Sequence, residues 1–115
     1  MNNVSKTQPL VSIVVPAYNH ENFIEETITS SLNQTYKNIE LIVVDDSSTD
    51  GTSSSVLELA KKDRRIRLIN RIGRSGLSSA IKEGCLCATG EILAIMDTDG
   101  QHEVSSISNG IKILI

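Results

Sequence analysis

The stretch Ile39-Glu-Leu-Ile-Val-Val-Asp-Asp46 joins an almost unbroken apolar run to two acids at its carboxyl end. Apolar residues at nearly every position, rather than at alternate ones, are typical of a strand that is buried on both faces. Such strands belong to parallel sheets that are covered by helices on both sides. The stretch therefore predicts a strand over 39–44 that ends at a pair of carboxylates.

Similar apolar runs occur before and after this stretch and predict three more strands. They cover 11–15, 66–69 and 91–96. We expect the first of them to stop at Pro16, because proline has no N–H to donate to a sheet ladder.

The segment between the first two strands has the period of a helix. Its apolar residues recur every four positions, at Ile24, Ile28 and Leu32. Asn22, followed three residues later by Glu25, has the form of a capping box. The pattern predicts an amphipathic helix over 22–33.

Further helices are predicted after the second, third and fourth strands. One covers 52–62, with Asp50 as its cap, and another runs from a cap at Ser75 to a stop at Gly90. The apolar stripe of the latter is Leu77, Ala80, Ile81, Gly84, Cys85 and Ala88. A last short helix is indicated by Val104, Ile107, Ile111 and Leu114.

The resulting order, β-α-β-α-β-α-β-α, predicts an α/β fold of Rossmann-like type. Regular alternation implies an open, mainly parallel sheet with helices on both faces, connected by right-handed crossovers. In such sheets ligands bind beyond the carboxyl ends of the strands. Polar clusters follow three of the predicted strands: 16–19, Asp45-Asp46 and Asp97-Thr-Asp99.

The acids in these clusters indicate a divalent cation. Several carboxylates at one crevice repel one another unless a cation or hydrogen-bond donors compensate. The Asp97-Thr-Asp99 spacing suits Mg²⁺ or Mn²⁺, which take oxygen ligands and share their shell with substrate phosphates. A glycine-rich phosphate loop, a dinucleotide fingerprint, a complete calcium loop and a zinc-ligand set are all missing from the sequence.

Composition limits the remaining function classes. The chain has 115 residues, 39% of them hydrophobic, and a net charge of -3, which fits one domain with an aliphatic core and disfavours nucleic acid as a partner. Cys85 and Cys87 are too close in sequence to staple distant loops, which indicates a reducing compartment. With no long apolar run and no secretory signal, we expect a cytoplasmic location. The inner face of the membrane would be reached only through the acceptor or further sequence.

Four stretches together resemble the family 2 glycosyltransferases, which have the GT-A nucleotide-sugar fold. They are, in the order of the family, 11–19, 41–52, 76–84 and 88–99. The stretch 96–102 is most similar to the polyprenyl-phosphate branch, to which dolichyl-phosphate mannose synthase belongs. The stretch 31–36 is more similar to members that build cell-envelope polysaccharides.

The resemblance implies a nucleobase pocket at the ends of the first two strands. Pro16, Ala17 and Tyr18 would line it, and Val44 and Asp46 would contact the edge of the base. A carboxylate suits that edge because it accepts a hydrogen bond from a ring N–H.

The resemblance also implies the metal site. Asp97 and Asp99 match the Asp-x-Asp motif that binds Mg²⁺ or Mn²⁺ and, through it, the sugar-nucleotide diphosphate; Asp99 is the implied catalytic residue. Gln101 matches a further residue near the metal. Arg71 is a candidate for meeting the diphosphate, the alternative being a solvated loop arginine.

The implied activity is inverting transfer of a sugar from a UDP- or GDP-linked donor to a polyprenyl phosphate or a saccharide. Acceptor residues of the family follow the Asp-x-Asp, and only 16 residues follow Asp99 here. We therefore expect 1–115 to be a single nucleotide-sugar-binding domain that is truncated before the acceptor part, or a short form that pairs with a second copy.

The alternative function is a nucleotide-binding remnant without catalytic activity. A receiver-type signalling domain is disfavoured because the first strand ends in 16–19 without an acid pair.

Overall fold

The computed structural model describes residues 8–73 and 76–96. Asp97, Asp99, Gln101 and the predicted helix near the carboxyl end lie outside the described residues, as does the predicted cap Ser75.

The described residues form one parallel four-stranded sheet of order β3-β2-β1-β4. Its strands are β1 (Val11–Ala17), β2 (Ile39–Asp45), β3 (Ile66–Asn70) and β4 (Ile92–Ile95). The first two strands in the chain occupy the centre of the sheet and are buried at every residue. This confirms the parallel sheet and the doubly buried strand that the sequence predicts.

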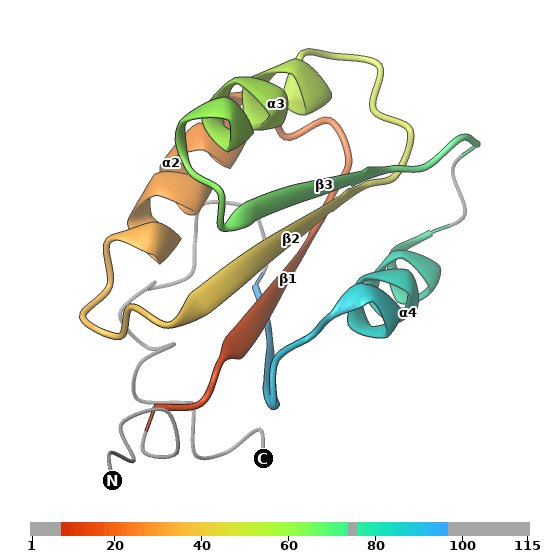
Figure 1. Cartoon of the computed structure of the whole chain (residues 1–115). Coiled ribbons are helices and arrows are strands. Elements are labelled where there is room, and N and C mark those ends of the chain that lie inside the picture. The colour runs from red at the N-terminus through yellow and green to blue at the C-terminus, as the bar shows by residue number, and fades with distance from the viewer. Residues whose placement is uncertain (1–7, 74–75, 97–115) are drawn as a thin grey trace, which may run out of the picture.

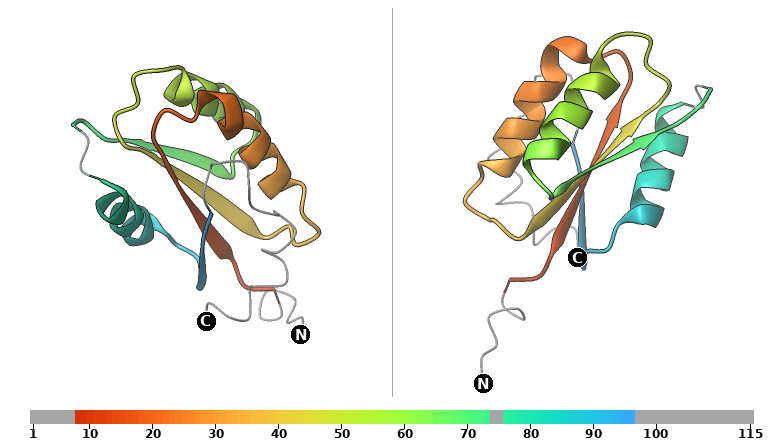
Figure 2. Two further views of the ribbon diagram at one scale, coloured as in Figure 1. Left: turned by 180° about the vertical axis from the view of Figure 1, so that it is seen from behind. Right: turned by 45° about the horizontal axis from the view of Figure 1, so that its top comes forward.

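Three helices cover the two faces of the sheet. Helices α2 (Glu21–Leu32) and α3 (Thr52–Lys62) lie side by side on one face, and α4 (Leu77–Cys87) lies on the other (Figures 1 and 2). The expected α/β architecture with helices on both faces is therefore confirmed.

Alternation along the central strands divides the core into two layers. Since successive side chains of a strand point to opposite faces, odd-numbered residues of β1 and β2 pack under α2 and α3, and even-numbered ones face α4. On the α4 side the buried cluster consists of Val14, Ile42, Val44 and Ala80. Both layers are aliphatic, as the composition predicts.

β1 continues through Pro16, where the sequence predicts an end. Pro16 pairs in register with Val44 of β2. The register with β4, on the other side, ends at Val14. No described strand pairing on that side requires an N–H from Pro16, so the ladder to β2 carries the strand on to Ala17.

The predicted capping box of α2 is wrong, although its apolar stripe is confirmed. The helix begins at Glu21, with His20 at the N-cap position and no side-chain cap. Asn22 and Glu25 are both exposed. The Glu21 N–H instead donates to Asp50 in the loop after β2, a contact that the local sequence does not reveal.

The stripe of α4 is also narrower than predicted. Ala80 and Gly84 are buried, but Leu77 is 60% exposed. Gly84 allows the helix to lie close to the sheet, because a Cβ there would fall 2.5 Å from Val14 Cγ1 and 3.0 Å from Val44 Cγ2.

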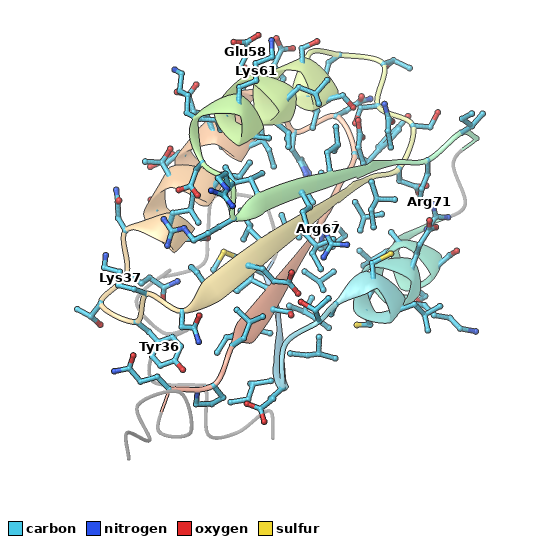
Figure 3. All side chains as sticks on the ribbon, in the orientation of Figure 1. Tyr36, Lys37, Glu58, Lys61, Arg67 and Arg71 are labelled. Carbon is cyan, nitrogen blue, oxygen red and sulfur yellow. The ribbon has the colours of Figure 1, made fainter. Side chains whose placement is uncertain are left out.

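A polar network fastens the sheet at the amino ends of its strands, on the α4 side. Glu40 accepts hydrogen bonds from Ser12 Oγ (2.5 Å), the Thr89 N–H (2.7 Å) and Arg67 Nη1 (3.0 Å). Burial acts to raise the pKa of Glu40, but these bonds together outweigh it and lower the pKa below its ordinary value. Arg67 projects from β3 toward α4 (Figure 3).

We predict that Gly84→Ala destabilises the fold. Alanine is the better helix former by about 1 kcal/mol, but overpacking against two buried valines costs about 1–3 kcal/mol. Urea unfolding should therefore show a net loss relative to Ser78→Ala, a control on an exposed position of the same helix. If both variants were equally stable, the close approach of α4 to the sheet would be wrong.

We also predict that Glu40 stabilises the fold in a pH-dependent way. Because its pKa is lowered from 4.5 in the folded state, its contribution is fully present above pH 4.5 and is lost as the pH falls through the lowered pKa. At neutral pH, Glu40→Gln should cost about 1–3 kcal/mol of unfolding free energy, and the difference from wild type should shrink in acid. Glu58→Gln, at an exposed ion pair with Lys61, is the matched control and should change little at any pH.

Candidate functional site

The carboxyl ends of β1 and β2 bring two loops side by side. The strands stay in register to their last pair, Ala17 and Asp45, and the Asp46 N–H then donates to Ala17 O at 2.9 Å. The loop before α2 and the loop before α3 therefore leave the sheet at the same point.

Asn19 fastens the first loop to the second. Its backbone adopts a left-handed conformation (φ 53°), which asparagine tolerates better than most residues. Its N–H donates to Ser48 Oγ (2.9 Å), and its Oδ1 accepts from the Thr49 N–H (2.8 Å). These reciprocal bonds hold the turn that follows Tyr18.

Asp50 also connects the two loops, because its carboxylate accepts hydrogen bonds from the first turns of two helices. Its carboxylate accepts from the Thr52 N–H (3.0 Å) at the start of α3 and from the Glu21 N–H (3.2 Å) at the start of α2. In return Glu21 Oε1 accepts from the Gly51 N–H at 3.1 Å. Desolvation acts to raise the pKa of Asp50, but the hydrogen bonds lower it overall. The N-cap of α3 is Gly51, so Asp50 stands one residue before the predicted cap position and bonds the first N–H of each helix instead.

The acids Asp45 and Asp46 point to opposite faces of the sheet. Asp45 follows the odd-numbered residues toward α3, where its fully buried carboxylate accepts hydrogen bonds from the Ser48 N–H (3.1 Å) and from the hydroxyls of Ser48 and Ser53. It shapes the loop in which Ser47 has a left-handed backbone (φ 66°).

Asp46 follows the even-numbered residues toward α4 and is 3% exposed. Its Oδ2 accepts from the Gly76 N–H at 2.9 Å, immediately before α4. Its Oδ1 lies 3.3 Å from Arg71 Nε. The carboxylate thus connects the end of β2 to both ends of the loop between β3 and α4.

Arg71 is held at the start of α4, and its side chain is only 8% exposed (Figure 3). Besides Asp46, its guanidinium approaches Glu83 (Nε to Oε1, 3.6 Å), and Nη2 donates to Ser79 Oγ (3.0 Å). The buried Nη1 has no hydrogen-bond partner within the described part of the chain. A buried guanidinium nitrogen without an acceptor is costly, and a ligand oxygen or ring nitrogen would satisfy it. The structure thus pairs Arg71 with the predicted base-edge acid, where the sequence suggested the diphosphate or solvent.

A cavity of about 260 Å³ opens between the β1–α2 loop and the start of α4. Its lining residues are Pro16, Ala17, Tyr18, His20, Asp46, Leu77 and Ala80. Four of these (Pro16, Ala17, Tyr18 and Asp46) are the residues predicted for the nucleobase pocket. Val44 is placed deeper, fully buried and packed with Ala80.

His20, Leu77 and Ala80 also line the cavity, although no sequence pattern selects them for it. Leu77 and Ala80 were expected in the apolar stripe of α4, and His20 stands before the expected start of α2. One sequence feature could have indicated Leu77: it directly follows a glycine in a stretch that resembles the family. His20 has no comparable signal, because only the tertiary bonds of the loop make it the N-cap.

A metal site is not found within the described ranges 8–73 and 76–96, where His, Cys, Asp and Glu form no group of three suited to a cation. Asp45 is saturated by loop donors, and Asp46 is engaged with Gly76 and Arg71. The predicted ligands Asp97, Asp99 and Gln101 lie outside the described residues. Their carboxylate and amide oxygens fit a hard cation such as Mg²⁺ or Mn²⁺.

Among the described residues, no helix has the length and apolar character needed to cross a membrane.

Comparison with known proteins gives a match over nearly the whole chain. Residues 12–114 match the sequence model described as glycosyl transferase family 2. The chain is 40% identical over 105 residues to the UDP-Glc:alpha-D-GlcNAc-diphosphoundecaprenol beta-1,3-glucosyltransferase WfaP of Escherichia coli, covering 91% of this chain and 41% of that protein. It is 38% identical over 121 residues to the dolichyl-phosphate beta-glucosyltransferase ALG5D of Trichomonas vaginalis, covering 96% of this chain and 37% of that protein.

The structure is similar to that of a mannosyltransferase from Pyrobaculum calidifontis in complex with GDP-Man and Mn²⁺. The TM-score is 0.75 at 36% sequence identity, over 80% of this chain and 28% of that chain. The likeness confirms the predicted GT-A type of fold. The chain spans less than half the length of each of these three proteins.

The geometry predicts that Asp45→Asn weakens the fold. The substitution keeps the size of the side chain but replaces one of two buried acceptor oxygens by an amide donor. Urea unfolding should show a loss of about 1–3 kcal/mol, because buried donors of the loop remain unpaired. Asp63→Asn, at a partly exposed pair with Arg65, should cost no more than about 1 kcal/mol. Equal losses in the two variants would contradict the structural role of Asp45.

Proposed function

Because the chain belongs to glycosyltransferase family 2, we propose that its cavity binds the nucleotide of a UDP- or GDP-linked sugar donor. The observation that carries this proposal is the buried pair of Asp46 and Arg71 beside an apolar cavity at the carboxyl edge of the sheet. At about 260 Å³, the cavity is smaller than the roughly 300–1,000 Å³ of pockets that enclose whole ligands. It suits one part of the donor, and its apolar lining suits the base.

Asp46 and Arg71 offer complementary groups to the edge of a base. The Asp46 carboxylate accepts a ring N–H, and Arg71 Nη1, which lacks a partner among the described residues, donates to a neighbouring oxygen. Uracil and guanine both present an N–H beside a carbonyl oxygen, so the pair supports either nucleotide. Pro16, Ala17 and Tyr18 contact the flat part of the nucleoside.

The cation of this proposal is Mn²⁺ or Mg²⁺, held by Asp97, Asp99 and Gln101. When bound, such a cation neutralises the negative charge that grows on the leaving nucleoside diphosphate. Manganese is supported by the similar mannosyltransferase, whose structure contains Mn²⁺ with GDP-Man.

The reaction proposed for the whole protein is a single displacement. An acceptor oxygen forms a bond to the anomeric carbon of the sugar while the bond to the nucleoside diphosphate breaks, so the configuration inverts. A polyprenyl-linked acceptor is supported by the printed activities of the Escherichia coli and Trichomonas relatives. A polyprenyl phosphate is already an anion and needs no general base, whereas a sugar hydroxyl does.

We predict that nucleotide affinity has two contributions, one from Asp46 that needs no metal and one from Mn²⁺ that needs Asp99. Calorimetric titration with UDP and GDP should show binding of at least one of them, tighter with Mn²⁺ than with EDTA present. Asp46→Asn should weaken binding about tenfold or more under both conditions, because it removes a charged acceptor from the base. Asp99→Ala should abolish only the gain that Mn²⁺ provides.

Urea unfolding of both variants serves as the control for folding. No binding of either nucleotide under any condition would refute the proposed function. Binding by Asp99→Ala that still tightens with Mn²⁺ would refute the metal assignment alone.

A further inference from the structure

Two polar side chains of α4 contact the guanidinium of Arg71 from outside the cavity. Ser79 Oγ accepts a hydrogen bond from Arg71 Nη2 at 3.0 Å, and Glu83 Oε1 lies 3.6 Å from Arg71 Nε. The described residues that line the cavity include neither of them. Because they are four residues apart, Ser79 and Glu83 lie one above the other on the same side of the helix. The helix therefore presents them to Arg71 as a pair.

The packing of α4 on the sheet fixes where this pair lies. Ala80 and Gly84, each one residue further along the helix, are buried. The absence of a side chain at Gly84 lets the helix lie close to Val14, since a Cβ there would fall 2.5 Å from Val14 Cγ1. Successive residues of a helix are turned by about 100°, so Ser79 and Glu83 lie beside the buried face. The contact that holds the helix on the sheet thus also holds the pair beside Arg71.

The side chain of Arg71 depends on such contacts for its orientation. Its backbone N–H donates to Asp45 O at 2.9 Å, but an arginine side chain has many rotamers to lose when it is ordered. Asp46 approaches Nε from the end of β2 at 3.3 Å, and Glu83 approaches the same nitrogen from α4. Because the guanidinium is planar, contacts at Nε and Nη2 also set the direction of Nη1. That nitrogen is buried and has no hydrogen-bond partner within the ranges described.

We propose that Glu83 is a positioning residue, which together with Ser79 holds Arg71 in the orientation that presents Nη1 to a ligand oxygen. This inference rests on the proposed function, in which Arg71 donates to the nucleotide. Asp46 lines the cavity, whereas Glu83 lies outside it, is 46% exposed and acts only through Arg71. Without Glu83, ordering of the guanidinium has to accompany binding, and the affinity falls.

A double-mutant cycle tests whether Glu83 acts through Arg71. Calorimetry with UDP and GDP in the presence of EDTA measures the affinity without the metal. Glu83→Ala should weaken binding by about two- to fivefold, the range expected for a partly exposed ion pair. In an Arg71→Ala background the same change should have no further effect, because the guanidinium that Glu83 orients is gone. The matched control is Glu58→Ala, at an exposed glutamate of α3 that pairs with Lys61, and it should bind as wild type does.

A second measurement needs no ligand. In nuclear magnetic resonance spectra of the free protein, the Arg71 Nε–H should exchange with water several times faster in Glu83→Ala than in wild type or Glu58→Ala. An unchanged exchange rate would refute the positioning role even if Arg71→Ala bound too weakly for the cycle to be measured.

The outcomes separate this inference from the function on which it rests. If wild type bound neither nucleotide, both proposals would fail. If wild type bound and Glu83→Ala matched Glu58→Ala, only the positioning role would be overturned. An equal loss with and without Arg71 would overturn it too, because Glu83 would then act by another route. Thermal unfolding of each variant confirms that a lost affinity is not a folding defect.

Discussion

The parallel pairing of β1 with β2 sets the positions of the loops and helices around it. Both strands are buried on both faces, so neither can carry an uncompensated polar side chain until it ends. Their register brings Ala17 and Asp45 to the same level, and the two polar loops must leave the sheet together. The bonds of Asn19 and Asp50 then fasten each loop to the other. The start of each helix is also held by a hydrogen bond that crosses from one segment to the other.

Because side chains alternate between the two faces of a strand, the neighbouring acids at the end of β2 have different roles. Asp45 and Asp46 are adjacent in sequence, but alternation sends one toward α3 and the other toward α4. Asp45 accepts hydrogen bonds from the N–H and hydroxyl groups of its loop, whereas Asp46 lines the cavity and pairs with Arg71. A pair of acids at a strand end therefore need not act as a pair. Here one acid builds the loop and the other serves the candidate site.

At the amino ends of the strands, the same alternation of side chains gathers polar groups that stabilise the fold. Ser12 and Glu40 lie on the α4 side of their strands, and Arg67 and Thr89 reach Glu40 from β3 and from the turn after α4. Buried acceptors are stabilising only when donors surround them, and Glu40 has several. The protein thus has one polar network at the amino edge of the sheet, which stabilises the fold, and another beside the cavity at the carboxyl edge.

Local sequence patterns predict the element order through β4, the burial of the central strands and the gathering of polar loops at the carboxyl edge of the sheet. Those features follow from apolar runs and helical periods, which are local and leave a direct record in the chain. Contacts between distant residues determine that β1 passes Pro16, that α2 starts without its own capping box and that Leu77 lines the cavity. The pairing of Arg71 with Asp46 also depends on such contacts. Each of these depends on which residues, distant in sequence, become neighbours once the strands are in register, and local patterns carry no record of such contacts.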